Sequence, residues 1–194
     1  MGTLNDLEVI KYNMLTLRQK EEFKTIKSLP NCIHLGCAYN NLTHLPELPK
    51  CKFVDCSNNQ LVHLSELPKC EKLDCFNNRL VHLPELPNCE ELDCSNNRLV
   101  HLSELPNCKT LNCFNNQLTE LPEFPRCEEL KCSYNQLVYL LELPKCVDCS
   151  NNQLVDLPEL SNCETLYCFN NAKLYYTREF ARRFGLTYLS PGKL

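Results

Sequence analysis

The chain of 194 residues contains no tryptophan, only four glycines and no long hydrophobic run. No apolar stretch approaches the roughly 20 residues that a membrane-spanning helix needs. The first residues also lack the apolar centre of a secretion signal. Residue 6 is Asp6 rather than Ser or Thr, so the N-terminus does not match the myristoylation pattern. These absences predict a chain that makes no use of a membrane.

What the sequence has instead is a repeat of 19 residues that runs from Cys32 to about Leu174. With the opening cysteine as position 1, the consensus is C-x-x-L-x-C-x-x-N-x-L-x-x-L-P-x-L-P-x. The eight copies open at Cys32, Cys51, Cys70, Cys89, Cys108, Cys127, Cys146 and Cys163. A fixed short period of this kind predicts a solenoid.

The seventh copy, residues 146–162, is two residues short. When Cys146 is aligned with the other opening cysteines, the missing residues fall between positions 1 and 6. The pair Cys146 and Cys149 is then a shortened repeat rather than a C-x-x-C redox motif. The deletion predicts a kink or bulge of the coil at this point.

The consensus resembles the leucine-rich repeat, L-x-x-L-x-L-x-x-N-x-L, with cysteine in place of leucine at positions 1 and 6. The short unit and its L-P-x-L-P ending are similar to repeats of secreted bacterial effectors and of giant DNA viruses. The resemblance implies a leucine-rich-repeat solenoid of the α/β class, mostly β, with a parallel sheet on its concave side. It also implies a protein-binding, non-enzymatic role, which we expect in the cytoplasm, or in the host cell cytoplasm if the chain is viral.

The residues of one repeat predict the same architecture. Positions 4 and 6 are apolar while positions 3, 5 and 7 are mostly polar, which is the alternation of a strand with one buried face. Leucine at positions 11, 14 and 17, with proline at 15 and 18, predicts an extended return path like polyproline II on the convex side. The asparagine at position 9 is expected to be buried and to hydrogen-bond the backbone.

The repeats, residues 32–171, are flanked by two segments that we expect to cap the ends of one structural domain. In the N-terminal cap, residues 1–31, Thr16 and Gln19 predict a capping box that opens a helix to about Lys27. Its expected packing residues are Leu17, Phe23 and Ile26.

The C-terminal cap comprises residues 172–194. A short helix over 178–184 is expected to begin after Thr177 and to end at Gly185. Phe180 and Phe184 would close the core, and residues 187–189 are expected to add a last strand.

All sixteen cysteines fall at positions 1 and 6, the two apolar columns of the repeat. Free cysteine packs as a small hydrophobic residue. We therefore expect buried, reduced thiols in a reducing compartment rather than a disulfide framework.

Charge is unevenly distributed along the chain. Residues 32–171 carry ten Lys and Arg against nineteen Asp and Glu, a net charge of −9, while residues 172–194 carry a net charge of +4. The acidic repeats argue against nucleic acid, whose phosphates require a cationic surface. A protein or peptide partner is expected to be basic.

Two columns on the outer face offer an alternative function. Position 13 supplies His44, His63, His82 and His101, and position 16 supplies a glutamate in each complete copy. Stacked imidazoles beside carboxylates suggest a metal- or pH-responsive stripe. A second alternative is a structural role, with exposed sheet edges mediating weak self-association.

The concave face is the favoured binding site because aromatic residues there stand among acidic ones. No catalytic constellation, metal site or cofactor is expected in a chain that consists of identical columns. The predicted partner-binding residues are Phe53, Glu71, Asp74, Phe76, Glu90, Glu91, Asp93, Phe114, Tyr134 and Tyr167.

Overall fold

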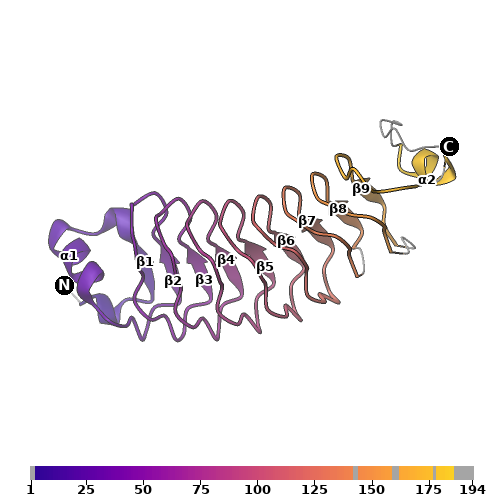
Figure 1. Ribbon diagram of the computed structural model, residues 1–194. Coiled ribbons are helices and arrows are strands. Elements are labelled where there is room, and N and C mark those ends of the chain that lie inside the picture. The colour runs from indigo at the N-terminus through magenta and orange to yellow at the C-terminus, as the bar shows by residue number, and fades with distance from the viewer. Residues whose placement is uncertain (1–2, 142–143, 159–161, 177, 186–194) are drawn as a thin grey trace.

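The computed structural model describes residues 3–141, 144–158, 162–176 and 178–185. Nine three-residue strands form one parallel sheet along an elongated coil (Figure 1). The strands are β1 (Val9–Lys11), β2 (His34–Gly36), β3 (Phe53–Asp55), β4 (Lys72–Asp74), β5 (Glu91–Asp93), β6 (Thr110–Asn112), β7 (Glu129–Lys131), β8 (Cys146–Asp148) and β9 (Thr165–Tyr167). This arrangement confirms the expected leucine-rich-repeat solenoid.

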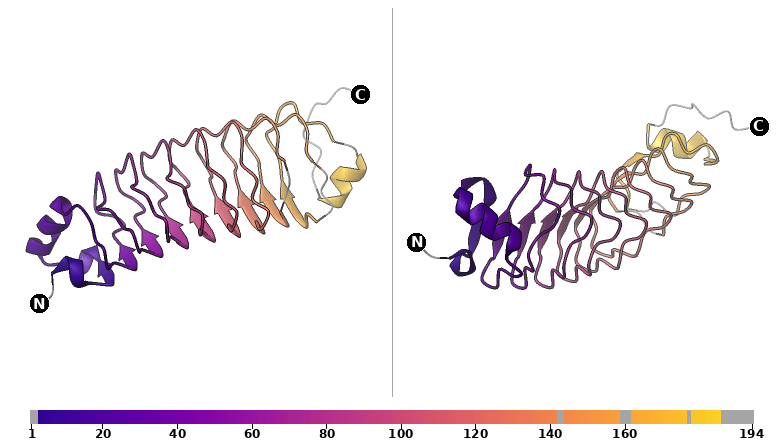
Figure 2. Two further views of the ribbon diagram at one scale, coloured as in Figure 1. Left: turned by 90° about the horizontal axis from the view of Figure 1, so that it is seen from below. Right: turned by 60° about the vertical axis from the view of Figure 1, so that its left-hand side comes forward.

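The sheet lines one long side of the coil, and the return segments form the other side without helix or strand in the described residues (Figure 2). From β2 to β7 every strand comprises positions 3 to 5 of its copy, and each position pairs with the same position of the next copy. Each repeat position therefore becomes a straight column across the sheet.

The core consists of the columns that the pattern predicts. In one repeat, Leu73, Cys75 and Leu80 all have zero exposure, and Leu86 from the return path is also buried. Position 4 is buried in every described strand of the repeats. Leucine and cysteine thus fill the interior together, each repeat covering the apolar face of its neighbour.

The asparagine at position 9 ties adjacent repeats together through backbone hydrogen bonds. The Asn116 amide nitrogen donates to the carbonyls of Cys94 and Cys113 at 3.0 and 3.1 Å. Its Oδ1 accepts from the backbone N–H of Leu99 at 2.9 Å. The expected role of this column is confirmed, since one side chain satisfies backbone groups of two repeats where the chain leaves the strand.

The residue before it, at position 8, lies in the left-handed region of backbone space. Six asparagines there have φ between 52° and 56°, and Tyr39 and Tyr134 adopt the same conformation with φ of 61° and 56°. Asparagine tolerates this conformation better than most residues. The two asparagines of the repeated Asn-Asn pair therefore have different roles. The first adopts the left-handed conformation, and the second hydrogen-bonds the backbone.

The N-terminal segment contributes more than the expected helix. Helix α1 (Leu17–Thr25) begins with the predicted capping box at Thr16 and ends two residues before Lys27. Phe23 is buried as expected, whereas Leu17 is 84% exposed, so its predicted packing role is wrong. Strand β1, which sequence reasoning missed, pairs with β2, and two 3-10 helices (Leu4–Asp6 and Tyr12–Met14) flank it.

Helix α2 (Arg178–Arg183) lies at the opposite end of the coil (Figure 1). Phe180 and Phe184 pack against the core with ring centroids 5.0 Å apart, and Gly185 has a positive φ of 59°. The strand expected at 187–189, and the capping residue Thr177, lie outside the described residues. No helix in the described part of the chain has both the length and the apolarity to cross a membrane.

Candidate functional site: the sheet face

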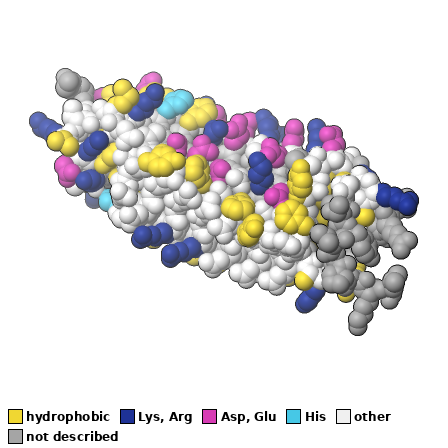
Figure 3. Space-filling view, turned by 90° about the horizontal axis from the view of Figure 1, so that it is seen from above, with side chains coloured by type: hydrophobic (Ala, Val, Ile, Leu, Met, Phe, Trp, Pro, Cys, Tyr) yellow, Lys and Arg dark blue, Asp and Glu magenta, His cyan; other side chains and the backbone are white. Residues whose placement is uncertain are grey.

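The candidate surface is formed by positions 3 and 5 of the strands, which flank the buried position 4, together with position 2 just before each strand. In β4 and β6 the central leucine is buried while both flanking residues are partly exposed. Column 5 brings Asp55, Asp74 and Asp93 onto three adjacent strands, β3 to β5. Figure 3 shows acidic and basic side chains side by side along one long edge of the molecule, with hydrophobic side chains among them.

Three of the predicted acidic residues are paired with lysines of a neighbouring repeat. Lys52 reaches Glu71 at 2.7 Å, and Lys72 reaches Glu91 at 2.6 Å. Glu90 pairs in the same way with Lys109 at 2.5 Å. Such half-exposed pairs stabilise a fold only weakly. They do, however, cancel charge, so these glutamates contribute less to an acidic surface than the sequence suggests.

Column 5 retains its negative charge in the middle of the sheet. Asp55 and Asp93 accept hydrogen bonds from Ser57 and Ser95 at 2.8 and 2.6 Å. Asp74 has a phenylalanine where the others have serine, and no donor in the described part of the chain hydrogen-bonds to its carboxylate.

The electrostatics of Asp74 reflect this position. Burial raises the pKa of the Asp74 carboxyl above its usual value, Lys72 opposes the shift, and the neighbouring carboxylates of Asp55 and Asp93 add to it. A cation supplied by a partner would therefore stabilise the charged form of Asp74.

A hollow of about 290 Å³ opens on the sheet face at the N-terminal end of this column. Gly36 stands at position 5 of β2, next to Asp55 of β3, and leaves the column empty there. The rings of His34 and Phe53 stack beside the hollow with centroids 4.5 Å apart and an interplanar angle of 15°. Asp74 also lines the hollow, which joins an aromatic pair to two carboxylates.

Sequence reasoning missed His34 and Gly36 as members of this site. The available signal was glycine itself, because Gly36 is the single glycine within the eight copies. The predicted residues Phe53 and Asp74 both line the hollow.

The other predicted aromatic residues lie elsewhere. Phe76 and Phe114, at position 7, are half-buried in the turn that follows the strand. Tyr134 stands at position 8, and its ring meets Phe114 edge to face at 5.3 Å. Tyr167 is 52% exposed in β9, six strands away from Phe53 in β3. The ten predicted residues are therefore distributed along the sheet from β3 to β9.

The deletion in the seventh copy lies at a different place from the one expected. Cys146 pairs with Glu129 of β7 and Thr165 of β9, so it occupies position 3 of the repeat and not position 1. The alignment of Cys146 with the opening cysteines was therefore wrong. The ladder runs from β7 to β9 in parallel register, and the shortening falls in the segment that precedes β8.

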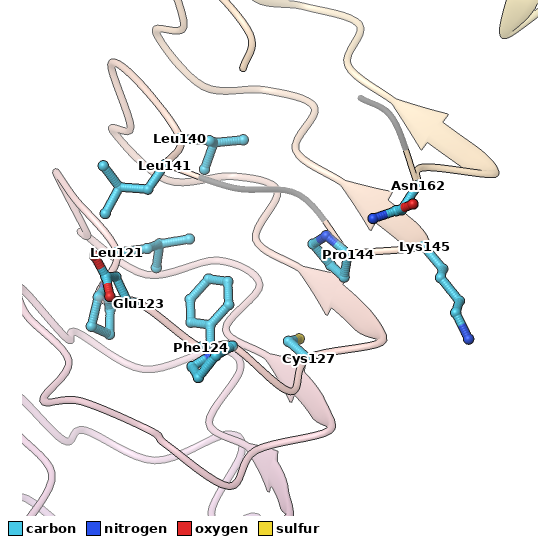
Figure 4. A pocket seen from close by; sticks show the side chains of 11 residues that line it. Leu121, Glu123, Phe124, Cys127, Leu140, Leu141, Pro144, Lys145 and Asn162 are labelled. Carbon is cyan, nitrogen blue, oxygen red and sulfur yellow. The ribbon is translucent and has the colours of Figure 1, made fainter. Parts of the chain in front are cut away.

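A second cavity, of about 620 Å³, accompanies this shortened segment. Leu121, Phe124 and Leu140 line it together with Cys127 and Pro144 (Figure 4). Cys127 is partly exposed, whereas the other described cysteines are buried. The strand register assigns Pro144 to position 1 of the next copy. Cys127 therefore has a proline, and not a cysteine, as its position-1 neighbour in the repeat that contains β8.

The cysteines from Cys32 to Cys132 are free thiols. Thiols of column 1 donate to the carbonyl of position 3, as Cys70 does to Lys72 at 3.2 Å. Burial raises the pKa of Cys70 and Cys89 to about 12. A protonated thiol is a poor nucleophile, so Cys70 and Cys89 do not suit cysteine-based catalysis.

The histidine column is exposed on the outer face. His44, His63, His82 and His101 all lie at the surface. Within the described ranges, no three His, Cys, Asp or Glu side chains are placed to share a metal ion.

Comparison with solved structures identifies the fold. YopM from Yersinia enterocolitica matches with a TM-score of 0.66 and 33% identity over 72% of this chain. YopM from Yersinia pestis, described as a leucine-rich effector protein, matches with a TM-score of 0.66 and 39% identity over 73% of this chain. A leucine-rich-repeat protein of Leptospira interrogans matches with a TM-score of 0.56 and 19% identity, covering 92% of this chain and 64% of its own length.

The chain spans 38% and 44% of the two YopM chains. No protein-family model matches it, and no curated protein sequence matches it. The expected similarity to bacterial effector repeats is confirmed at the level of fold and repeat.

Proposed function

We propose that this leucine-rich-repeat chain is a non-catalytic scaffold that binds a basic protein or peptide segment on its concave sheet face. The observation that carries the proposal is the row of Asp55, Asp74 and Asp93 beside the exposed ring of Phe53. Aromatic residues next to a cluster of like charges are typical of protein interfaces. The cytoplasm, where the thiols stay reduced, is the compartment in which we expect it to act.

The charge distribution supports a basic partner. Glu71, Glu90 and Glu91 are held by lysines of the protein itself, whereas no described residue gives Asp74 the hydrogen bonds that its neighbours receive. A partner that brings Lys or Arg to column 5 would relieve repulsion within the column. The net charge of −9 over the repeats would also speed the approach of a basic segment.

The proposal is tested by peptide selection against the full chain. A random peptide library is selected on the wild-type protein, and the recovered peptides are measured on Asp74→Lys and on Glu85→Lys. Both variants change the charge equally, but Glu85 is an exposed residue of position 16, away from the sheet face. We expect peptides rich in Lys and Arg whose affinity falls at least about tenfold on Asp74→Lys.

Binding to Glu85→Lys should stay within about twofold of wild type, because exposed charges that touch no ligand act mainly through the screened net field. The proposal fails if the selected peptides carry no positive charge. It also fails if both variants lose affinity equally while their melting temperatures match that of the wild type.

A further inference from the structure

We propose that the hollow over Gly36 is a socket for a single arginine side chain of the partner, whose guanidinium lies beside Phe53 and faces Asp55 and Asp74. This inference rests on the proposed function and assigns the ligand chemistry of one point on that surface. The volume of about 290 Å³ lies at the lower limit of small-molecule sites, which suits one long side chain rather than a larger ligand.

The lining of the hollow matches the two halves of an arginine side chain. Ile10, Leu35 and Val54 line the hollow, but their side chains are buried in the core. The apolar side chain available there is therefore that of Val9, which is 54% exposed and on which a methylene stem would pack. The stacked rings of His34 and Phe53 offer an aromatic wall, against which a flat guanidinium packs favourably.

The carboxylates favour a cation despite two lysines at the rim. Lys72 pairs with Glu91 at 2.6 Å and also interacts electrostatically with Asp74 and Asp55. When Glu91 is counted with Asp55 and Asp74, three carboxylates stand against the two lysines, Lys11 and Lys72. Because Asp74 receives no hydrogen bond in the described part of the chain, a guanidinium would supply donors that it lacks.

Gly36 has no conformational reason to be glycine. Its φ does not fall in the left-handed region, and a Cβ added there would meet only the Ile10 carbonyl oxygen, at an ordinary 3.9 Å. The same column carries Asp, Asn, Lys or Tyr in other strands. The consequence of having glycine at this position is therefore the open space above it. A larger side chain would fill that space without straining the backbone.

The test follows the backbone amide NMR signals of the full chain during titration with N-acetyl-arginine amide. A separate titration with N-acetyl-lysine amide serves as the comparison. We expect saturable shifts at Gly36, Phe53 and Asp74 with the arginine compound, and dissociation constants at least about tenfold higher for the lysine compound. Equal affinity for both compounds, or shifts spread over the whole surface, would overturn the assignment.

Gly36→Leu is the blocking variant, and Thr110→Leu is its control on the same face in β6. Gly36→Leu should abolish the arginine titration, and Thr110→Leu should leave it unchanged, with both melting temperatures within about 2 °C of wild type. Retained arginine binding in Gly36→Leu would overturn the socket.

The selected peptides separate this inference from the proposed function. If Asp74→Lys weakens peptide binding but Gly36→Leu does not, the scaffold proposal stands and the socket is refuted. If neither change weakens binding, both are refuted.

Discussion

Replacing Asn116 by alanine should show how much the position-9 column stabilises the coil. The Asn116 side chain makes four hydrogen bonds, accepting from Leu99 N at 2.9 Å and donating to the carbonyls of Cys94, Cys113 and Phe114 at 3.0, 3.1 and 3.3 Å. Alanine would leave the backbone N–H of the buried Leu99 without this acceptor. It would also remove a donor from three carbonyls in two repeats.

The magnitude follows from these contacts. A buried donor left unsatisfied costs about 1–3 kcal/mol, and each further net hydrogen bond contributes about 0.5–1.5 kcal/mol. Carbonyls have a second lone pair, so we take the lower part of that range for each and expect a total loss of about 3–5 kcal/mol. That is a large share of the stability of a typical domain, about 5–15 kcal/mol.

The measurement is chemical denaturation of both proteins in reducing buffer at 25 °C, followed by far-UV circular dichroism. Gln117→Ala is the matched control, because Gln117 is the next residue and its side chain is exposed. The control should change the free energy of unfolding by less than about 0.5 kcal/mol. A loss below about 1 kcal/mol in Asn116→Ala would refute the reasoning that this column satisfies the backbone between repeats.

Three further outcomes are expected. Tyr39→Asn should stabilise the fold by about 1–2 kcal/mol, because asparagine suits a φ of 61°. The new side chain would also offer an acceptor to Asn58 Nδ2, which is buried without a partner in the described part of the chain. The measurement is thermal denaturation, and a lower melting temperature of the variant would contradict this. Iodoacetamide at pH 8 should label Cys127 before Cys89, because Cys127 is partly exposed and its pKa of about 11 is lower than the pKa of about 12 of Cys89. The order of labelling is read by peptide mass spectrometry, and the reverse order would count against the cavity. Asp74→Asn should raise the melting temperature at neutral pH, because burial raises the folded-state pKa of Asp74 and so disfavours its charged form. The gain should vanish as falling pH protonates the wild-type carboxyl. A difference in melting temperature that does not change with pH would disprove the burial of the charge as its cause.

The columns of the solenoid could be predicted from the sequence because each repeat position is used identically. Leu73 and Cys75 are buried, and the position-9 asparagines bond the backbone, as the alternation and the chemistry of the side chains require. Position 7 was harder to predict. Serine and phenylalanine alternate there, and the column lies past the strand end, where Ser57 folds back onto Asp55 and Phe76 becomes half-buried.

The candidate site was predicted only in part for a related reason. The period places Lys52 and Glu71 side by side, since both occupy position 2 of successive copies, but the linear pattern does not show which exposed side chains turn toward each other. The placement of Cys146 failed because two missing residues can be assigned to several points in a repeat with equal sequence agreement. Only the hydrogen-bond register of β8 distinguishes them.

The sequence by itself determined the period, the buried columns and the sign of the charge on the repeats. These properties follow from the alternation of apolar and polar residues and from the composition, and both recur in each copy. The tertiary structure decided which charges remain unpaired, where the coil opens into cavities, and that an empty position at Gly36 lies beside Phe53 and Asp74. Those features arise from contacts between residues of successive repeats, and their energies depend on distance in space rather than on order along the chain.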